Sequence, residues 1–152
     1  MASLVSHISR ISHLPEVLMV SHHTALIYTM VLVSAADGDM TDAELTVIGD
    51  IIRGLPVFKD YDPEQLPTAA ADCAELLSVD DGFETVIGMI GRALPERLRE
   101  TAYALACDVA AADESADQEE LRLLEMLCHH LKIDRLVTAA IERATRARHA
   151  TA

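Results

Sequence analysis

Residues 33–45 read VSAADGDMTDAEL, and residues 109–121 read VAAADESADQEEL, 76 positions further along the chain. Each stretch follows an apolar segment with helical spacing and precedes another such segment. A repeat at a fixed separation indicates a duplicated supersecondary unit, which here consists of a helix, an acidic turn and a second helix. The identical pairs are Val33/Val109, Ala35/Ala111, Ala36/Ala112, Asp37/Asp113, Glu44/Glu120 and Leu45/Leu121.

The repeat and the composition together predict an all-α fold. Apolar residues make up 51% of the chain but aromatic residues only 3%, so the core must be aliphatic, which suits helix-on-helix packing. A length of 152 residues fits one domain, covering residues 1–152. We expect a single bundle of seven or eight helices containing two pseudo-symmetric helix–acidic turn–helix units, at about residues 24–55 and 100–131.

Local signals predict the helix boundaries. Residues 3–13 place their apolar side chains on one face, which indicates a short amphipathic helix. Pro15 suits the first turn of a second helix ending near Ala36. Thr41 and Glu44 form a capping box for a helix that stops before Pro56. Later starts are predicted at Asp62-Pro63, after Asp80-Asp81-Gly82, at Leu94-Pro95, at Asp117 with Glu120, and at Asp134.

The net charge limits the classes of molecule that the protein can bind. Twenty-five acidic residues against 12 basic ones give a net charge of −13, which repels phosphate backbones and anionic lipid surfaces. We therefore expect a protein partner, one with a basic surface, and no nucleic acid. A homodimer and a peripheral membrane contact remain open alternatives.

The cysteines and the apolar runs indicate the compartment. Cys73, Cys107 and Cys128 are odd in number and far apart, which favours buried, reduced thiols over disulfides or a cysteine zinc site. No signal peptide is visible, and the most apolar run, Thr24 to Ala36, is too short to span a bilayer. The sequence predicts a cytoplasmic protein without a membrane span.

The acidic turns are the candidate functional site. Asp37, Asp39 and Glu44 lie within eight residues, and divalent cations such as Ca²⁺ and Mg²⁺ need several hard oxygen ligands. The spacing departs from a calcium-binding EF-hand, because Gly38 comes at the second position and the glutamate comes too early. A complete cage from this turn alone is therefore not expected.

The second turn keeps Asp113 and Glu120 but has Glu114 and Ser115 where the first has Gly and Asp. A site shared by both turns is thus favoured over two independent sites. The predicted metal ligands are Asp37, Asp39, Glu44, Asp113 and Glu120, with Ca, Mg, Mn or Zn as the ion. The alternative is ordinary helix capping, which explains Thr41 with Glu44 and Asp117 with Glu120 without any ligand.

Catalysis has little support in the sequence. No nucleophile elbow, phosphate-binding loop, HExxH motif or dinucleotide turn is present. Glu125 and His129 share a helical face, but a zinc site there is a minor alternative to a surface histidine. The leading interpretation is a non-enzymatic binding module, and the alternative is a metal-dependent hydrolase-like enzyme that uses the same carboxylates.

An apolar helix ending in AADG, followed by acidic residues and an EL that begins the next helix, resembles the tellurite-resistance TerB-like family. The resemblance covers about residues 24–55 and 100–145. It implies an all-helical domain, in the cytoplasm or at the inner membrane face, linked with tellurite and other stress responses. It also implies that Asp37, Asp39, Glu44, Asp113 and Glu120 are the metal ligands, although Glu114 and Ser115 depart from the pattern.

Overall fold

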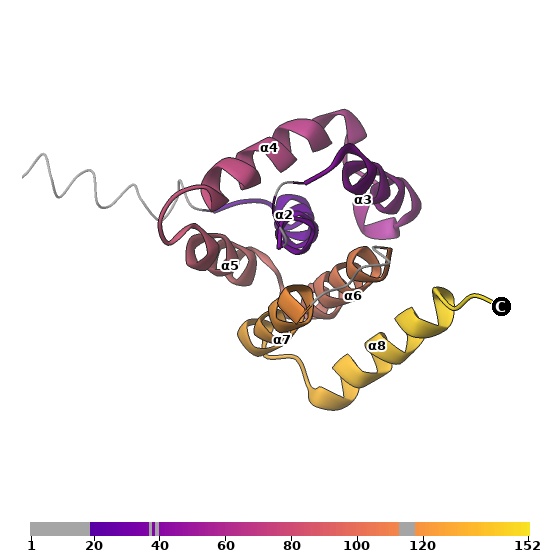
Figure 1. Cartoon of the computed structure of the whole chain (residues 1–152). Helices are drawn as coiled ribbons and strands as arrows, with labels where there is room; N and C mark the ends of the chain where they lie inside the picture. The colour runs from indigo at the N-terminus through magenta and orange to yellow at the C-terminus, as the bar shows by residue number, and fades with distance from the viewer. Residues whose placement is uncertain (1–18, 37, 39, 113–117) are drawn as a thin grey trace, which may run out of the picture.

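The structure is a computed structural model that describes residues 19–36, 38, 40–112 and 118–152. These residues form seven α-helices and two short 3₁₀ helices and contain no strand (Figure 1). The all-α prediction is therefore confirmed, whereas the pseudo-symmetry of the two units stays a prediction. The elements are α2 (His22–Ser34), α3 (Asp42–Gly54), η1 (Pro56–Phe58), η2 (Pro63–Gln65), α4 (Leu66–Leu77), α5 (Gly82–Ala93), α6 (Glu96–Ala112), α7 (Gln118–Leu131) and α8 (Arg135–Arg148).

Helix α2 is the centre of the bundle. In Figure 1 it is seen nearly end-on between α3, α4, α5 and α6. All residues from 25 to 34 are buried, and α2 packs most extensively against α6, α4 and α5. A helix that is apolar on every side must be covered on every side, so this segment becomes the core helix around which the others assemble.

The predicted start of this helix at Pro15 is wrong. Met19 and Val20 are not helical, and α2 begins at His22, where the Ser21 hydroxyl accepts a hydrogen bond from the Thr24 amide at 3.1 Å. The serine satisfies an amide at the helix end that has no partner within the helix, which fixes the boundary. Pro15 itself and the predicted helix at residues 3–13 lie outside the described residues.

Most other boundaries agree with the sequence. Thr41 and Glu44 form the expected capping box at the start of α3, and the Asp134 carboxylate accepts from the Leu136 amide at 2.8 Å. Asp62 caps the 3₁₀ helix η2, which leads directly into α4. Asp117, the expected cap of α7, lies outside the described residues.

Helix α8 lies at the edge of the bundle and packs mainly against α6. Two polar contacts join these helices. Tyr103, 1% exposed, donates a hydrogen bond from its hydroxyl to Glu142 Oε1 at 2.6 Å, and Arg148 Nη2 lies 2.7 Å from Asp108 Oδ1. A charge-assisted hydrogen bond requires a specific geometry, so the bond from the buried Tyr103 fixes the position of α8 on α6.

The buried cysteines predict how stability depends on pH. Burial raises the pKa of the Cys73 and Cys107 thiols from 9.0 to about 12. Above pH 9 the unfolded chain therefore loses thiol protons that the folded chain retains, and the free energy of unfolding falls as pH rises toward 12. Urea unfolding from pH 7 to 10.5 should show constant stability up to about pH 8 and then a decline. In Cys73→Ala the decline should be shallower; an unchanged slope would contradict this assignment.

Candidate functional site

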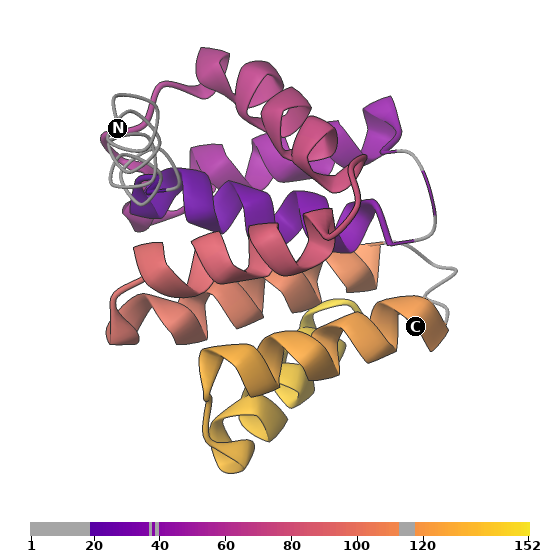
Figure 2. The same ribbon diagram turned by 90° about the vertical axis from the view of Figure 1, so that its left-hand side faces the viewer.

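Four helix ends meet at one end of the bundle. Figure 2 shows the C-terminal ends of α2 and α6 and the N-terminal ends of α3 and α7 on the same side. A cavity of about 350 Å³ lies there, with walls from all four helices and the residue before α3. Its lining consists of Ser34, Thr41, Ala43, Glu44, Val47, Val109, Ala112 and Glu120. The cavity is therefore built from both copies of the sequence repeat.

Glu44 lines this cavity from the first turn of α3. Its Oε2 accepts a hydrogen bond from the Thr41 amide at 2.7 Å, and its own amide donates to Thr41 Oγ1 at 3.2 Å. The capping box is thus complete, as the sequence predicts. Since a capping carboxylate also faces the positive end of the helix dipole, Glu44 is held in place without any ligand.

Glu120 lines the same cavity from the first turn of α7. Glu120 occupies the position in the second repeat that Glu44 occupies in the first. The exposed fraction of Glu120 is only 2%. Burying a carboxylate is expensive unless charges or hydrogen bonds compensate it. The structure therefore brings two of the five predicted ligands, Glu44 and Glu120, to one cavity.

Ser34 is a cavity residue that the sequence analysis did not identify. It is 2% exposed, and its hydroxyl has no hydrogen-bond partner within the described part of the chain. A buried hydroxyl without a partner costs free energy, which a ligand in the cavity would recover. The sequence did carry a signal, because Ser34 aligns with Ala110 in an otherwise apolar stretch of the repeat.

The other predicted ligands, Asp37, Asp39 and Asp113, lie outside the described residues. Within residues 19–36, 38, 40–112 and 118–152, no group of three or more His, Cys, Asp or Glu side chains is placed to hold a metal ion. The described cavity walls offer two carboxylates and two hydroxyls, and no histidine or cysteine. This donor set fits a hard cation such as Ca²⁺, Mg²⁺ or Mn²⁺ better than Zn²⁺.

The two residues of the minor zinc alternative, Glu125 and His129, lie away from the cavity of the acidic turns. Glu125 and His129 line a separate cavity of about 1070 Å³ between α6, α7 and α8, together with Cys128. Burial raises the pKa of the Cys128 thiol, which disfavours the thiolate that zinc requires. Because no metal-holding group of three is found in the described ranges, this cavity has no more support as a zinc site than the sequence gave it.

None of the described helices has both the length and the apolar character needed to cross a bilayer.

Comparison with known proteins identifies the family. The profile of the family described as Tellurite resistance protein TerB matches residues 23–143, from the start of α2 to within α8. Neither the curated proteins nor the solved structures gave a significant match. The matched range includes both repeats and the cavity between them, and it covers well over half of the chain. The chain therefore belongs to the tellurite resistance protein TerB family.

Proposed function

We propose that this protein is a non-enzymatic, cation-responsive binding module of a tellurite- or stress-resistance system, acting in the cytoplasm. The divalent cation would occupy the cavity between the two acidic turns. The observation that carries the proposal is that Glu44 and Glu120, equivalent residues of the two repeats, line one cavity although they are 76 positions apart.

The chemistry of the walls supports a cation rather than an organic ligand. Two carboxylates and the hydroxyls of Ser34 and Thr41 supply oxygen donors to a small space. Like charges in such a space repel one another unless a cation or protons intervene. Asp37 and Asp113, which follow α2 and α6 within three residues, would add carboxylates from both repeats.

The response to a cation would come from the helix ends. The cavity is lined by residues of α2, α3, α6 and α7, so one ion bound there would hold four helix ends together. Met40 and Glu119 are direct neighbours of the cavity residues Thr41 and Glu120, and both line a second, apolar cavity. A change in either turn would therefore reach the walls of this second cavity. We expect the protein partner of the module to have a basic surface, since the chain carries a net charge of −13.

The proposal predicts stabilisation by a divalent cation. A ligand that binds only the folded state stabilises it by about 2.7 kcal/mol at a hundredfold excess over its dissociation constant. The melting temperature should rise by several degrees with Ca²⁺, Mg²⁺ or Mn²⁺, relative to a chelator-treated sample. The Asp37→Asn, Asp113→Asn double variant should remain folded and lose this rise.

A matched control distinguishes the cavity from the acidic surface in general. Asp50 and Asp72 are exposed and line no part of the cavity, so an Asp50→Asn, Asp72→Asn variant has the same change in charge. It should keep the full cation-dependent rise. If no cation shifts the melting temperature of the wild-type protein, helix capping alone explains the acidic turns.

The alternative function is a metal-dependent hydrolase-like enzyme that uses the same carboxylates. No contact among the described cavity residues favours it over the binding module. We expect no turnover in phosphatase, esterase and nuclease assays with added Mg²⁺, Mn²⁺ or Zn²⁺. Reproducible turnover that Asp37→Asn abolishes would replace the binding-module proposal.

A further inference from the structure

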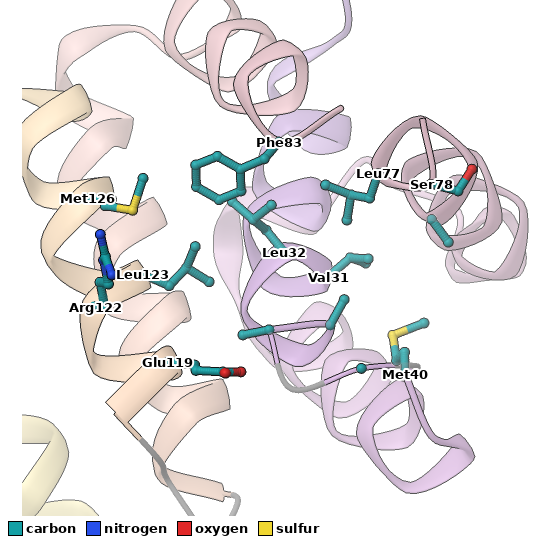
Figure 3. Close-up of a pocket in the computed structure, with 14 residues that line it drawn as sticks. Val31, Leu32, Met40, Leu77, Ser78, Phe83, Glu119, Arg122, Leu123 and Met126 are labelled. Carbon is teal, nitrogen blue, oxygen red and sulfur yellow. The ribbon is translucent and has the colours of Figure 1, made fainter. Parts of the chain in front are cut away.

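A second cavity, of about 600 Å³, opens between α2, α4, α5 and α7. We call it the apolar groove. Figure 3 shows Leu32 of α2, Leu77 of α4, Phe83 of α5 and Leu123 of α7 directed into it, with Met40 and Met126 at its ends. Among the described lining residues, the charged side chains are Glu119 and Arg122, both on α7. The described walls of the groove are thus mainly apolar, with one acid and one base.

The side chains in the groove suit an apolar helix face. Met40, Leu77, Phe83 and Met126 are all only partly buried, so each exposes apolar surface to the groove. Methionine is flexible and polarizable, and it adapts to side chains of different shapes. Grooves of this kind bind amphipathic helices through anchors spaced three or four residues apart.

We propose that the apolar groove is occupied by the chain's own N-terminal segment, residues 1–18. Leu4, Ile8 and Ile11 of this segment recur at the spacing of one helical face. These three side chains are the anchors that would enter the groove. A segment tethered to the domain competes well with free partners, because the tether gives it an effective concentration in the millimolar range.

Charge favours this occupant over a second copy of the protein. Arg10 and Glu16 are the only Lys, Arg, Asp or Glu residues in positions 1–18, so the segment carries no formal net charge at pH 7 with neutral histidines. The remaining residues therefore carry the whole net charge of −13. Two such domains repel each other, whereas the segment can approach the acidic surface without this cost.

The connection is long enough for the segment to reach the groove. The chain enters α2 at its cap Ser21, and the groove is lined by the last turn of α2 and the residues after it, such as Leu32 and Ala36. The 13 residues of α2 span about 20 Å. An extended connector over positions 14–20 spans up to about 23 Å. Residues 3–13 could therefore lie along the groove of their own molecule.

Limited proteolysis of the full-length protein tests the proposal. Arg10 is the sole Lys or Arg in residues 1–18, so trypsin cleavage after it reports how often the segment leaves the groove. Ile8→Asp removes a central anchor, and cleavage should become at least about tenfold faster. Ser6→Asp adds the same charge on the opposite face of the predicted helix, and its cleavage rate should match that of the wild-type protein.

Methyl NMR of the methionines locates the binding. In Ile8→Asp the signals of Met40 and Met126 should shift, whereas those of the core residues Met30 and Met89 should stay in place. Ser6→Asp should leave all four unchanged. Equal cleavage rates with unchanged Met40 and Met126 signals would overturn the proposal. A second result would also overturn it: the Met40 and Met126 signals shift only when the protein concentration is raised, and light scattering shows a dimer at that concentration. A second copy of the protein would then occupy the groove.

Discussion

Gly82→Ala should destabilise the protein by about 3 kcal/mol, through a backbone clash at the start of α5. A Cβ atom at this position would lie 2.1 Å from the Leu76 carbonyl oxygen and 3.0 Å from the Leu77 Cα. Both atoms belong to the backbone of α4, so no side chain can rotate away. The connection between α4 and α5 would have to open, and the melting temperature should fall by about 6–12 °C.

Gly91→Ala is the matched control, because it lies in the same helix. A Cβ atom at Gly91 has no neighbour within 4 Å. Alanine is the better helix former in a helix interior, so this variant should be more stable than the wild-type protein by about 0.5–1 kcal/mol. Urea unfolding of the two variants measures both effects. Similar effects in the two variants would show that the start of α5 does not lie against the end of α4 as it does in the structure.

Leu127→Ala should destabilise the protein by about 3 kcal/mol, by leaving an unfilled space in the hydrophobic core. Leu127 is 0% exposed on α7, the helix that carries Glu120 and one wall of the apolar groove. Lost burial and the unfilled space both contribute to this cost. Denaturant unfolding should show a lower midpoint with an unchanged dependence on denaturant concentration, since the exposed surface of the unfolded chain hardly changes.

Leu121→Ala provides the comparison on the same helix. Leu121 is 57% exposed, so most of its side chain already contacts water. Its truncation should change the free energy of unfolding by less than about 0.5 kcal/mol. The difference between the two leucines tests which face of α7 packs into the bundle. A larger loss from Leu121→Ala than from Leu127→Ala would mean that α7 is rotated relative to the structure.

The sequence predicted the parts of the fold that depend on neighbouring residues. The capping box of Thr41 with Glu44 and the cap at Asp134 need only a few adjacent side chains, and both are confirmed. The start of α2 was misplaced because the segment is apolar on every side, which leaves no periodicity to mark its limits. Ser21 was the available signal, since serine is a preferred cap and Thr24 follows three residues later.

The candidate site was predictable in part. The repeat alone indicated that Glu44 and Glu120 would approach each other, and they do line one cavity. The burial of Glu120 was not predictable, since capping residues at a helix start are usually exposed. Ser34 was missed because its role depends on packing between four helices. The apolar groove was missed for the same reason, since its walls come from segments far apart in the chain.

The most direct test of the central claim locates the cation itself. Mn²⁺ broadens NMR signals in a way that falls steeply with distance, and Val47 of α3 and Val109 of α6 line the cavity from the two repeats. Adding a small amount of Mn²⁺ to methyl-labelled protein should broaden these two valines most strongly. Excess Mg²⁺ should reverse the effect, and the Asp37→Asn, Asp113→Asn variant should not show it. Strongest broadening elsewhere, or none at all, would contradict a cation site between the acidic turns.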